Sequence, residues 1–312
     1  MICSLAFVFP GQGSQSLGML AELAQAHPQI REAFDEASTG CGADVWALSQ
    51  NGPEDQLNQT EFTQPALLAA SIGVWRAWLA NAGAQPARLA GHSLGEYAAL
   101  VAAGSLSLFD AARLVRTRGQ LMQAAVPAGT GAMAAVLGAD DAQVAAICAE
   151  ASGDGVVVPA NYNSPGQIVI GGHAGAVDRA IAALTVQGVR KIVRLAVSVP
   201  SHTPLMREAA DQLAAVMADM AWRMPDRPVV QNANAAVHGS LPEIRDALAR
   251  QLYLPVRWTD CVQALAAQGT TRILECGPGK VLSGLVKRID KSIDARSLGT
   301  PVEWDSALAL DF

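Results

Sequence analysis

A serine flanked by glycines, between a short apolar run and a helix-forming segment, is the feature that most constrains this chain. Residues 91–95 read Gly-His-Ser-Leu-Gly, and the segment that follows is rich in alanine and leucine. This is the sequence form of a nucleophile elbow, a sharp strand-to-helix turn that exposes the serine hydroxyl and aims the next backbone N–H at a developing oxyanion. A plain glycine-rich turn has the same spacing. The interpretation therefore requires that the chain also supply a base, an oxyanion partner and a substrate handle.

Composition limits the possible classes of protein. With 312 residues, 51% hydrophobic and 16% charged, the chain can bury a large core in one or two domains. The formal net charge is -6 and there is no long lysine or arginine block, which argues against nucleic acid as a ligand. The apolar run from Ile2 to Phe9 lacks a basic leader and predicts a first strand instead of a signal peptide. Because no apolar run reaches membrane-spanning length, we expect no association with a membrane.

The cysteines indicate a reducing compartment. They are an odd number at wide spacing with no Cys-x-x-Cys pair, which favours free thiols over disulfides or a zinc site. They are Cys3, Cys41, Cys148, Cys261 and Cys276. We therefore expect a cytoplasmic protein without a structural metal.

Two glycine-containing loops could suggest nucleotide binding, but their spacing excludes it. The apolar strand Leu5 to Phe9 runs into the loop Gly11 to Gln15, where the next glycine of a dinucleotide motif would have to stand at Ser16. The segment Gly277 to Lys280 lacks both the upstream glycine and the hydroxyl residue of a phosphate-binding P-loop. The first loop still offers backbone donors and the flexible amide of Gln12.

The pattern of elements predicts an α/β chain with an inserted unit. Residues 129–198 read as strand, helix, strand, strand, helix and strand, which is the ferredoxin-like order. The strands are expected at 132–137, 156–161, 167–170 and 191–197, and the helices at 140–152 and 175–187. The segments 1–128 and 199–312 alternate helix and strand and are expected to form one large α/β subdomain around this small one.

Helix signals outside the insert include Pro28 to Ala37, and Pro65 to Leu79 with Thr63 as its cap. A further helix begins after Ser107, and on a helical wheel its apolar residues span roughly 120° with Arg118 in the middle of that arc. Arg118 could extend from a buried edge to solvent, or pair with a structural carboxylate. It could also hold a carboxylate that arrives with a substrate, because its planar fork bonds both oxygens at once. The helix alone leaves these alternatives open.

His202 is the favoured base among the five histidines, with His173 as the alternative. His92 is adjacent to the serine, where side chains on a tight turn diverge, and His27 lies at a polar helix boundary. His173 and His238 stand beside glycines, as surface histidines often do. His202 lies where the chain leaves the small subdomain, in a crevice between two subdomains, and it follows the serine in chain order as in hydrolase-type folds.

Short motifs occur along nearly the whole chain in a consistent order and spacing. They are Phe9-Pro10-Gly11-Gln12-Gly13-Ser14-Gln15, Gly91-His92-Ser93-Leu94-Gly95-Glu96-Tyr97, Arg118-Gly119, Gly129-Thr130-Gly131-Ala132-Met133, Asn163-Ser164-Pro165-Gly166-Gln167, Val199-Pro200-Ser201-His202, Arg250-Gln251-Leu252-Tyr253 and Gly277-Pro278-Gly279-Lys280-Val281-Leu282. With these motifs the chain resembles the bacterial malonyl-CoA:acyl-carrier-protein transacylases of type II fatty acid synthesis. The resemblance implies an α/β-hydrolase-like large subdomain with a ferredoxin-like small one.

The resemblance also implies an activity and its residues. Ser93 would be the nucleophile, His202 the base and Arg118 the clamp on the malonyl carboxylate, while Gln251 would support the histidine in place of a triad acid. The malonyl group would pass from CoA to Ser93 and then to the phosphopantetheine thiol of an acyl carrier protein. No metal, nicotinamide or other redox cofactor is needed. A serine esterase or thioesterase, or a catalytically silent interaction protein, would share the elbow but would not require Arg118.

Further residues follow from the same resemblance. Gln12 and the backbone N–H of Leu94 would form the oxyanion hole. Met122 and Met133 are expected pocket walls, although methionines on apolar faces are also ordinary core residues. Asn163 and Gln167 are expected beside the pantetheine arm.

The carrier proteins of this family are acidic, so a basic rim would guide docking. The candidates are Arg190, Lys191, Lys280, Lys287 and Arg288. A scatter of solvated surface charges explains them equally well. The sequence leaves the oligomeric state open, with a monomer among the options.

Overall fold

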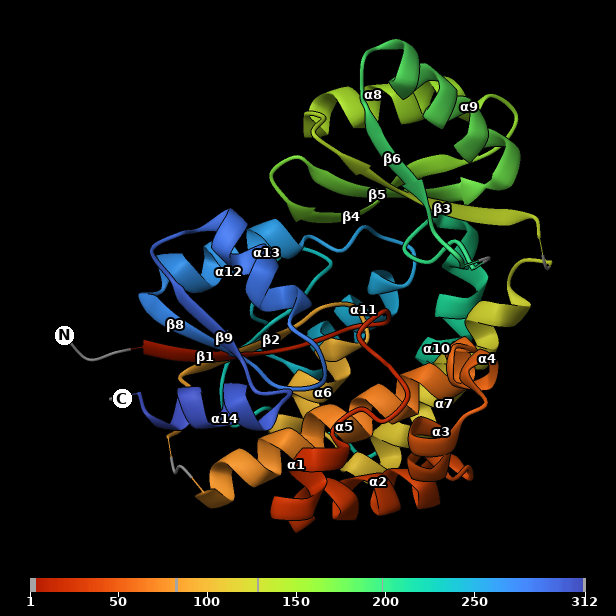
Figure 1. Cartoon of the computed structure of the whole chain (residues 1–312). Coiled ribbons are helices and arrows are strands. Elements are labelled where there is room, and N and C mark those ends of the chain that lie inside the picture. The colour runs from red at the N-terminus through yellow and green to blue at the C-terminus, as the bar shows by residue number, and fades with distance from the viewer. Residues whose placement is uncertain (1–3, 82–83, 128, 198, 311–312) are drawn as a thin grey trace.

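The computed structural model describes residues 4–81, 84–127, 129–197 and 199–310. It contains two separate β-sheets (Figure 1). The first is parallel, with five strands in the order β7-β2-β1-β8-β9. Its strands are β1 (Ser4–Phe9), β2 (Arg88–Gly91), β7 (Val229–Val230), β8 (Thr270–Glu275) and β9 (Asp294–Ser297).

Helices cover both faces of the parallel sheet. On one face, Phe7 of β1 packs edge-on against Trp75 and Trp78 of α5 (Thr60–Asn81), with ring centroids 5.3 and 5.8 Å apart. On the other face, Val8 belongs to a core cluster formed with α12 (Trp258–Ala267) and α13 (Val281–Ile289). Alternate residues of the apolar strand therefore serve two cores, as expected for a strand buried on both sides.

The remaining helices of this large part surround these layers. They are α1 (Ala21–Ala26), α2 (Pro28–Cys41), α3 (Val45–Asn51), α4 (Glu54–Leu57), α6 (Gly95–Ala102), α7 (Leu108–Ala124), the 3₁₀ turn Pro204–Met206, α10 (Arg207–Ala218), α11 (Leu241–Gln251) and α14 (Pro301–Leu308). None of the helices in the described ranges is both long and apolar enough to cross a bilayer.

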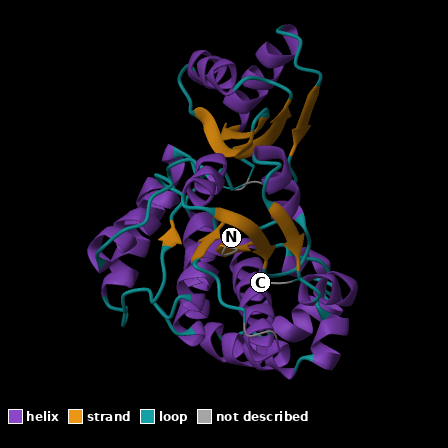
Figure 2. Ribbon diagram, turned by 90° about the vertical axis from the view of Figure 1, so that its left-hand side faces the viewer, coloured by secondary structure: helices purple, strands orange, loops and turns teal. Residues whose placement is uncertain are grey.

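The second sheet is antiparallel, with four strands in the order β4-β5-β3-β6. Its elements are β3 (Gly131–Leu137), α8 (Asp141–Ser152), β4 (Val157–Ser164), β5 (Gln167–His173), α9 (Ala174–Val186) and β6 (Lys191–Arg194). Both helices cover the outer face of the sheet (Figures 1 and 2). The ferredoxin-like order predicted from the sequence is confirmed, and so is the mixed α/β class. The predicted boundaries at 128/129 and 198/199 involve residues 128 and 198, which lie outside the described residues.

The small sheet is joined to the large part at its edge strand β4. Tyr162 N–H donates to the Val256 carbonyl at 2.9 Å, and Val256 N–H donates to the Ala160 carbonyl at 2.9 Å. These backbone bonds tie the small sheet to the loop before α12. The strand end that carries Asn161 and Asn163 is therefore held beside the large part.

The structure differs from the predicted elements at the start of α5 and in several short elements. Helix α5 begins at Thr60, so Thr63 is not its cap; the Thr63 hydroxyl lies inside the helix and donates to the Leu57 carbonyl at 2.5 Å. Pro65 is the sixth residue of α5 and lies inside the helix, where it removes the hydrogen bond that an amide would donate to the Glu61 carbonyl. Strand β9 and the short helices α1, α3, α4 and α14 were not expected, because short polar segments such as Asp294–Ser297 lack a clear period.

The elbow glycines are required by close contact between β1, β2 and α6. A Cβ on Gly95 would lie 2.0 Å from the Phe9 carbonyl oxygen, and one on Gly91 would lie 2.0 Å from the Gly95 carbonyl group. Both obstacles are backbone atoms, so no side chain can move aside. This confirms the close strand–helix approach predicted from the Gly-x-Ser-x-Gly spacing.

Replacing Gly95 by alanine is therefore expected to lower the free energy of unfolding by about 3 kcal/mol or more, because the backbone must shift. The matched control is Gly284→Ala, in α13, where a Cβ meets nothing within 4 Å. That change should raise stability by about 0.5–1 kcal/mol through helix propensity. Chemical denaturation of both variants checks the prediction, and equal midpoints would contradict it.

Candidate active site

Ser93 occupies the strained corner between β2 and α6. Its φ angle is 52°, in the left-handed region that residues with a side chain seldom adopt. The corner is held from the neighbouring strand: Ser93 N–H donates to Asn232 Oδ1 at 2.7 Å, and Asn232 Nδ2 donates to the Gly91 carbonyl at 2.7 Å. Both ends of the turn are therefore fixed by one buried amide, and the serine side chain is free to face the cavity.

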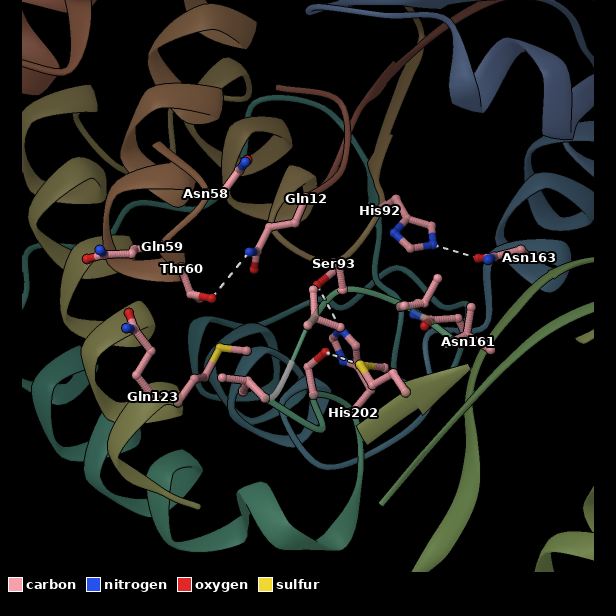
Figure 3. A pocket seen from close by; sticks show the side chains of 18 residues that line it. Gln12, Asn58, Gln59, Thr60, His92, Ser93, Gln123, Asn161, Asn163 and His202 are labelled. Carbon is pink, nitrogen blue, oxygen red and sulfur yellow. Dashed lines mark hydrogen bonds between the residues drawn. The ribbon is translucent and has the colours of Figure 1, made fainter. Parts of the chain in front are cut away.

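The Ser93 hydroxyl lies 2.7 Å from Nε2 of His202 (Figure 3). On the other side of the ring, His202 Nδ1 lies 2.7 Å from the main-chain carbonyl of Gln251. A carbonyl oxygen only accepts hydrogen bonds, so Nδ1 carries the proton and the lone pair of Nε2 faces the hydroxyl. The arrangement holds the imidazole in the tautomer that a general base requires.

The surroundings of His202 keep its imidazole neutral. The residue is only 3% exposed, and burial is the main cause that lowers its pKa to about 3. The positive charge of Arg118 lowers this pKa further, as does His92, whereas the Gln251 carbonyl acts in the opposite direction. His202 therefore has a free lone pair over the whole physiological pH range.

Arg118 of α7 is fully buried and contacts the same serine. Its Nη1 donates to Gln64 Oε1 at 2.8 Å, and its Nη2 donates to Gln251 Oε1 at 3.1 Å and to Ser93 Oγ at 3.3 Å. The guanidinium also lies over the Tyr97 ring, 5.5 Å from its centroid. Across the described parts of the chain, Arg118 takes part in no ion pair, which removes the alternative of a structural carboxylate partner. A buried cation held only by neutral oxygens is suited to receive an anion.

Gln251 contacts the site differently from the sequence-based expectation. Its main-chain carbonyl, not its side chain, meets His202. The side-chain Nε2 donates to the Ser93 carbonyl at 2.9 Å and to Glu96 Oε2 at 3.0 Å, which turns Oε1 toward Arg118. A flipped amide would place donor against donor and acceptor against acceptor, so its orientation is determined from both sides.

Besides Gln64, which bonds Arg118, the sequence did not predict the roles of Glu96 and Asn232. The Glu96 carboxylate is fully buried and accepts from Gln231 Nε2 at 2.9 Å, Asn232 N–H at 2.7 Å and Gln251 Nε2. Burial raises its pKa to about 7 despite these bonds and the charge of Arg118. A signal for Asn232 existed: polar residues that follow a parallel strand gather at the edge where ligands bind.

A cavity of about 380 Å³ opens in front of Ser93, between the two sheets. Met122 of α7 and Met133 of β3 both line it, and so do His92 and Asn163. Figure 3 shows the cavity with Gln59 and Gln123 on one side and Asn161 and Asn163 on the other. The His92 ring bonds Asn163 and not Ser93: its Nε2 lies 2.8 Å from Asn163 Oδ1. His92 belongs to the large part and Asn163 to the small sheet, so the two parts meet at this pair.

The other predicted site residues are placed as follows. Gln12 is exposed and lines the cavity, with its Nε2 donating to Thr60 Oγ1 at 3.4 Å. Leu94 stands at the start of α6, where a backbone N–H has no intrahelical acceptor. Gln167 does not line the cavity, and its Oε1 accepts from Arg288 Nη1 at 2.6 Å. The roles predicted for these residues, and for Met122, Met133 and Asn163 toward a substrate, stay predictions.

The described residues contain no group of three or more His, Cys, Asp or Glu side chains arranged to hold a metal ion. The four cysteines in this part of the chain are Cys41, Cys148, Cys261 and Cys276, and all are buried as free thiols. Cys3 lies outside the described residues. None of these four is among the residues that line the cavity.

Comparison with known proteins gives the same assignment over nearly the full length. Residues 6–300 match the acyl transferase domain family. The chain is 53% identical to the malonyl CoA-acyl carrier protein transacylase of Escherichia coli (strain K12), over 98% of this chain and 99% of that protein. It is 42% identical to the corresponding protein of Bacillus subtilis (strain 168), over 97% and 96%.

Solved structures agree with the sequence relatives. The malonyl-CoA:acyl carrier protein transacylase of Xanthomonas oryzae is 71% identical and superposes with a TM-score of 0.97, covering 98% of this chain and 97% of that one. A malonyl-transacylase in complex with a type II PKS acyl-carrier protein is 50% identical, with a TM-score of 0.96 and coverage of 98% and 99%. On its sequence, its fold and the geometry around Ser93, the chain belongs to the family of malonyl-CoA:acyl-carrier-protein transacylases.

Proposed function

We propose that this protein transfers malonyl groups from CoA to the phosphopantetheine thiol of an acyl carrier protein, through a malonyl ester on Ser93. The observation that supports this most strongly is the position of Arg118. Its unpaired guanidinium lies 3.3 Å from the Ser93 hydroxyl, which is itself 2.7 Å from the free lone pair of His202. A nucleophile, a base and a carboxylate receptor thus meet at one point, as an acyl group bearing a distal carboxylate requires.

In the first half-reaction, His202 Nε2 takes the Ser93 proton as the oxygen attacks the thioester carbonyl of malonyl-CoA. A positioned base of this kind contributes about 10²–10⁴ to the rate. The tetrahedral intermediate collapses, the carbon–sulfur bond breaks, and the imidazolium returns its proton to the departing CoA sulfur. The Gln251 carbonyl at Nδ1 stabilises the imidazolium in between.

The oxyanion of the intermediate forms next to the start of α6. We assign the Leu94 N–H and the Gln12 amide as its donors, because the first N–H groups of a helix point outward and carry its positive dipole end. Gln12 would have to leave Thr60 to reach the oxyanion. Each such donor contributes on the order of 10²–10³ to the rate.

In the second half-reaction, the carrier thiol enters the same cavity after CoA has left. His202 removes the thiol proton, the sulfur attacks the malonyl ester, and Ser93 regains its proton as it leaves. The cycle is of the ping-pong type, because one product departs before the second substrate reacts. Neither step calls on a metal or a redox cofactor. The expected independence from metals and redox cofactors stays a prediction, and so does the cytoplasmic location.

The hydrolase alternative fits the site less well. A serine esterase or thioesterase would need an apolar acyl pocket, whereas an uncharged acyl group here would leave a desolvated guanidinium beside the nucleophile. An interaction protein without catalysis would have no reason to maintain the strained Ser93 corner and the His202 tautomer together.

The basic rim extends over both parts of the fold. The Arg288 side chain of α13 hydrogen-bonds the Gln167 side chain at the start of β5. Within the small sheet, Gln167 lies opposite Leu137 of β3, and Leu137 also lies opposite Lys191 of β6. Residues from the large and the small part therefore contribute positive charge at one end of the small sheet, and all the candidate side chains on this rim are exposed. An acidic carrier protein would be attracted to such a surface.

Intact-mass spectrometry tests the proposed function. Mixing the protein with malonyl-CoA should add one malonyl group, absent in Ser93→Ala, and the group should move to a holo carrier protein when that is added. Loss of the adduct to water at the same rate without carrier would instead indicate a hydrolase. No adduct at all would indicate the catalytically silent alternative.

The Arg118→Ala variant tests the carboxylate receptor. Malonyl loading should fall by roughly 10²-fold, because a charge-assisted pair is lost, and the preference for malonyl over acetyl should disappear. The matched control is Arg113→Ala on the exposed side of the same helix, which should leave both rates unchanged. Pre-steady-state loading with each acyl-CoA measures the ratio, and an unaltered preference in Arg118→Ala would disprove the receptor role.

Charge reversal at Lys287 and Arg288 tests carrier docking. We expect a roughly tenfold higher apparent KM for the carrier protein and unchanged loading from malonyl-CoA, since only the protein partner needs this surface. Reversal of Arg31 on α2, which does not line the cavity, is the control. An equal loss in both half-reactions would contradict docking at this site.

A further inference from the structure

We propose that Glu96 sets the preference of the site for malonyl groups: its buried carboxylate fixes the Gln251 amide, which holds the Arg118 guanidinium in the orientation that receives a carboxylate. Glu96 is not among the residues that line the cavity, so it acts as a positioning residue. The inference rests on the proposed function and deepens it, because it names the residue behind the carboxylate receptor.

The Glu96 carboxylate is an acceptor on both oxygens. Oε1 accepts from Gln231 Nε2 at 2.9 Å, and Oε2 accepts from Asn232 N–H at 2.7 Å and from Gln251 Nε2 at 3.0 Å. The residue is fully buried in the first turn of α6. Burial of a carboxylate is costly unless donors surround it, so the carboxylate and its three donors hold one another in place.

Two of these bonds lead to the catalytic groups by different routes. The bond to Asn232 supports the nucleophile, because the Asn232 side chain accepts from Ser93 N–H at 2.7 Å. The bond to Gln251 supports the receptor, because an amide whose Nε2 faces Glu96 turns its Oε1 toward Arg118 Nη2, 3.1 Å away. The first route serves every acyl group, whereas the second matters only to an acyl group that carries a carboxylate.

Glu96 is the stronger of the two acceptors that orient the Gln251 amide. Gln251 Nε2 donates to the Ser93 carbonyl at 2.9 Å and to Glu96 Oε2 at 3.0 Å. The carbonyl is neutral and the carboxylate is charged, and a hydrogen bond to an ionised group is roughly twice as strong as a neutral one. Loss of the carboxylate therefore removes most of the preference of this amide for one orientation.

The orientation matters because amide oxygens hold both arms of the Arg118 fork. Nη1 donates to Gln64 Oε1 at 2.8 Å, and Nη2 donates to Gln251 Oε1 at 3.1 Å. Gln64 belongs to α5 and Gln251 to α11, so the plane of the guanidinium depends on both helices. A planar fork bonds both oxygens of a carboxylate only when the two planes match. A turned Gln251 amide would set its NH2 group against Nη2 and tilt the fork.

Two substitutions of similar size at Glu96 test the inference. Glu96→Met keeps the length of the side chain and has no oxygen for the Gln251 amide. Glu96→Gln keeps one oxygen, which can still accept from Asn232 and Gln251 while its NH2 group faces Gln231. Gln231 can then turn over, because its Oε1 has no hydrogen-bond partner among the described residues. That turn breaks the Gln231 bond to the Ile244 carbonyl, so Glu96→Gln should lower the melting temperature and keep the acyl preference.

The measured quantity is the ratio of malonyl to acetyl loading on Ser93. We obtain kcat/KM for loading from each acyl-CoA by quenched intact-mass spectrometry at pH 8, above the pKa of about 7 to which burial raises the Glu96 carboxyl. Glu96→Met should lower the ratio about tenfold, because a hydrogen bond that orients the receptor is lost. Glu96→Gln should keep the ratio of the unaltered protein. Equal losses with both substrates in Glu96→Met, or an equally low ratio in Glu96→Gln, would overturn the proposal.

A double-mutant cycle determines whether Glu96 acts through Gln251. Gln251→Met removes the amide and keeps the main-chain carbonyl that contacts His202, and it should lower the same ratio. Addition of Glu96→Met to Gln251→Met should lower the ratio no further. The control is Gln231→Met, which removes the donor on the other oxygen of Glu96 and should leave the ratio unaltered. Reductions that multiply in the double variant count against the inference.

The same measurements separate the inference from the proposed function. If the unaltered protein forms no malonyl ester on Ser93, the proposed function itself is wrong. If the ester forms and moves to the carrier protein, but Gln251→Met keeps the malonyl preference, only the inference is wrong. This second result decides the matter even if Glu96→Met fails to fold, because Gln251→Met leaves the Glu96 carboxylate with its bonds to Gln231 and Asn232.

Discussion

The site depends on one buried positive charge without a direct counter-ion. Arg118 is fully enclosed, and among the residues that the structure describes its guanidinium joins no ion pair and bonds the neutral oxygens of Gln64, Gln251 and Ser93. A buried cation is tolerated when every oxygen around it is oriented toward it, and the structure around Ser93 supplies that orientation. The same charge is suited to receive a carboxylate, and it adds to burial, the larger cause, in lowering the pKa of His202. The guanidinium and the imidazole both contact the Ser93 hydroxyl.

A connected set of amides transmits this constraint to the scaffold. Gln251 contacts His202 with its backbone, Arg118 with its side-chain oxygen and Ser93 with its side-chain nitrogen. Glu96 determines which way that amide faces, and Asn232 holds the Ser93 corner from the adjacent strand. Because each group has one orientation that satisfies its partners, the nucleophile, base and receptor are positioned together. The small sheet then closes the cavity from outside through the His92–Asn163 pair.

Much of this was predictable from local sequence. The spacing of Gly91, Ser93 and Gly95 predicted the elbow, and the period of α7 placed Arg118 on a buried face. The alternation of elements predicted the ferredoxin-like sheet. The short polar strand β9 and the start of α5 were missed, because weak local patterns are decided by the strands and helices packed around them. Glu96 and Asn232 are visible in the sequence as polar residues. Glu96 bonds Gln231 and Asn232 across about 135 residues of chain, so no local pattern predicts these contacts.

The sequence by itself determined which chemical groups the protein carries, the backbone corner that presents Ser93, and the order of elements, because these follow from local sterics and periodicity. Only the tertiary structure decided that the main chain of Gln251, and not its side chain, supports His202. Only the tertiary structure showed that Arg118 lacks an ion-pair partner within the described residues and lies against the nucleophile. The physical reason is that charge compensation and hydrogen-bond direction depend on distances between elements far apart in the chain, which no local pattern encodes.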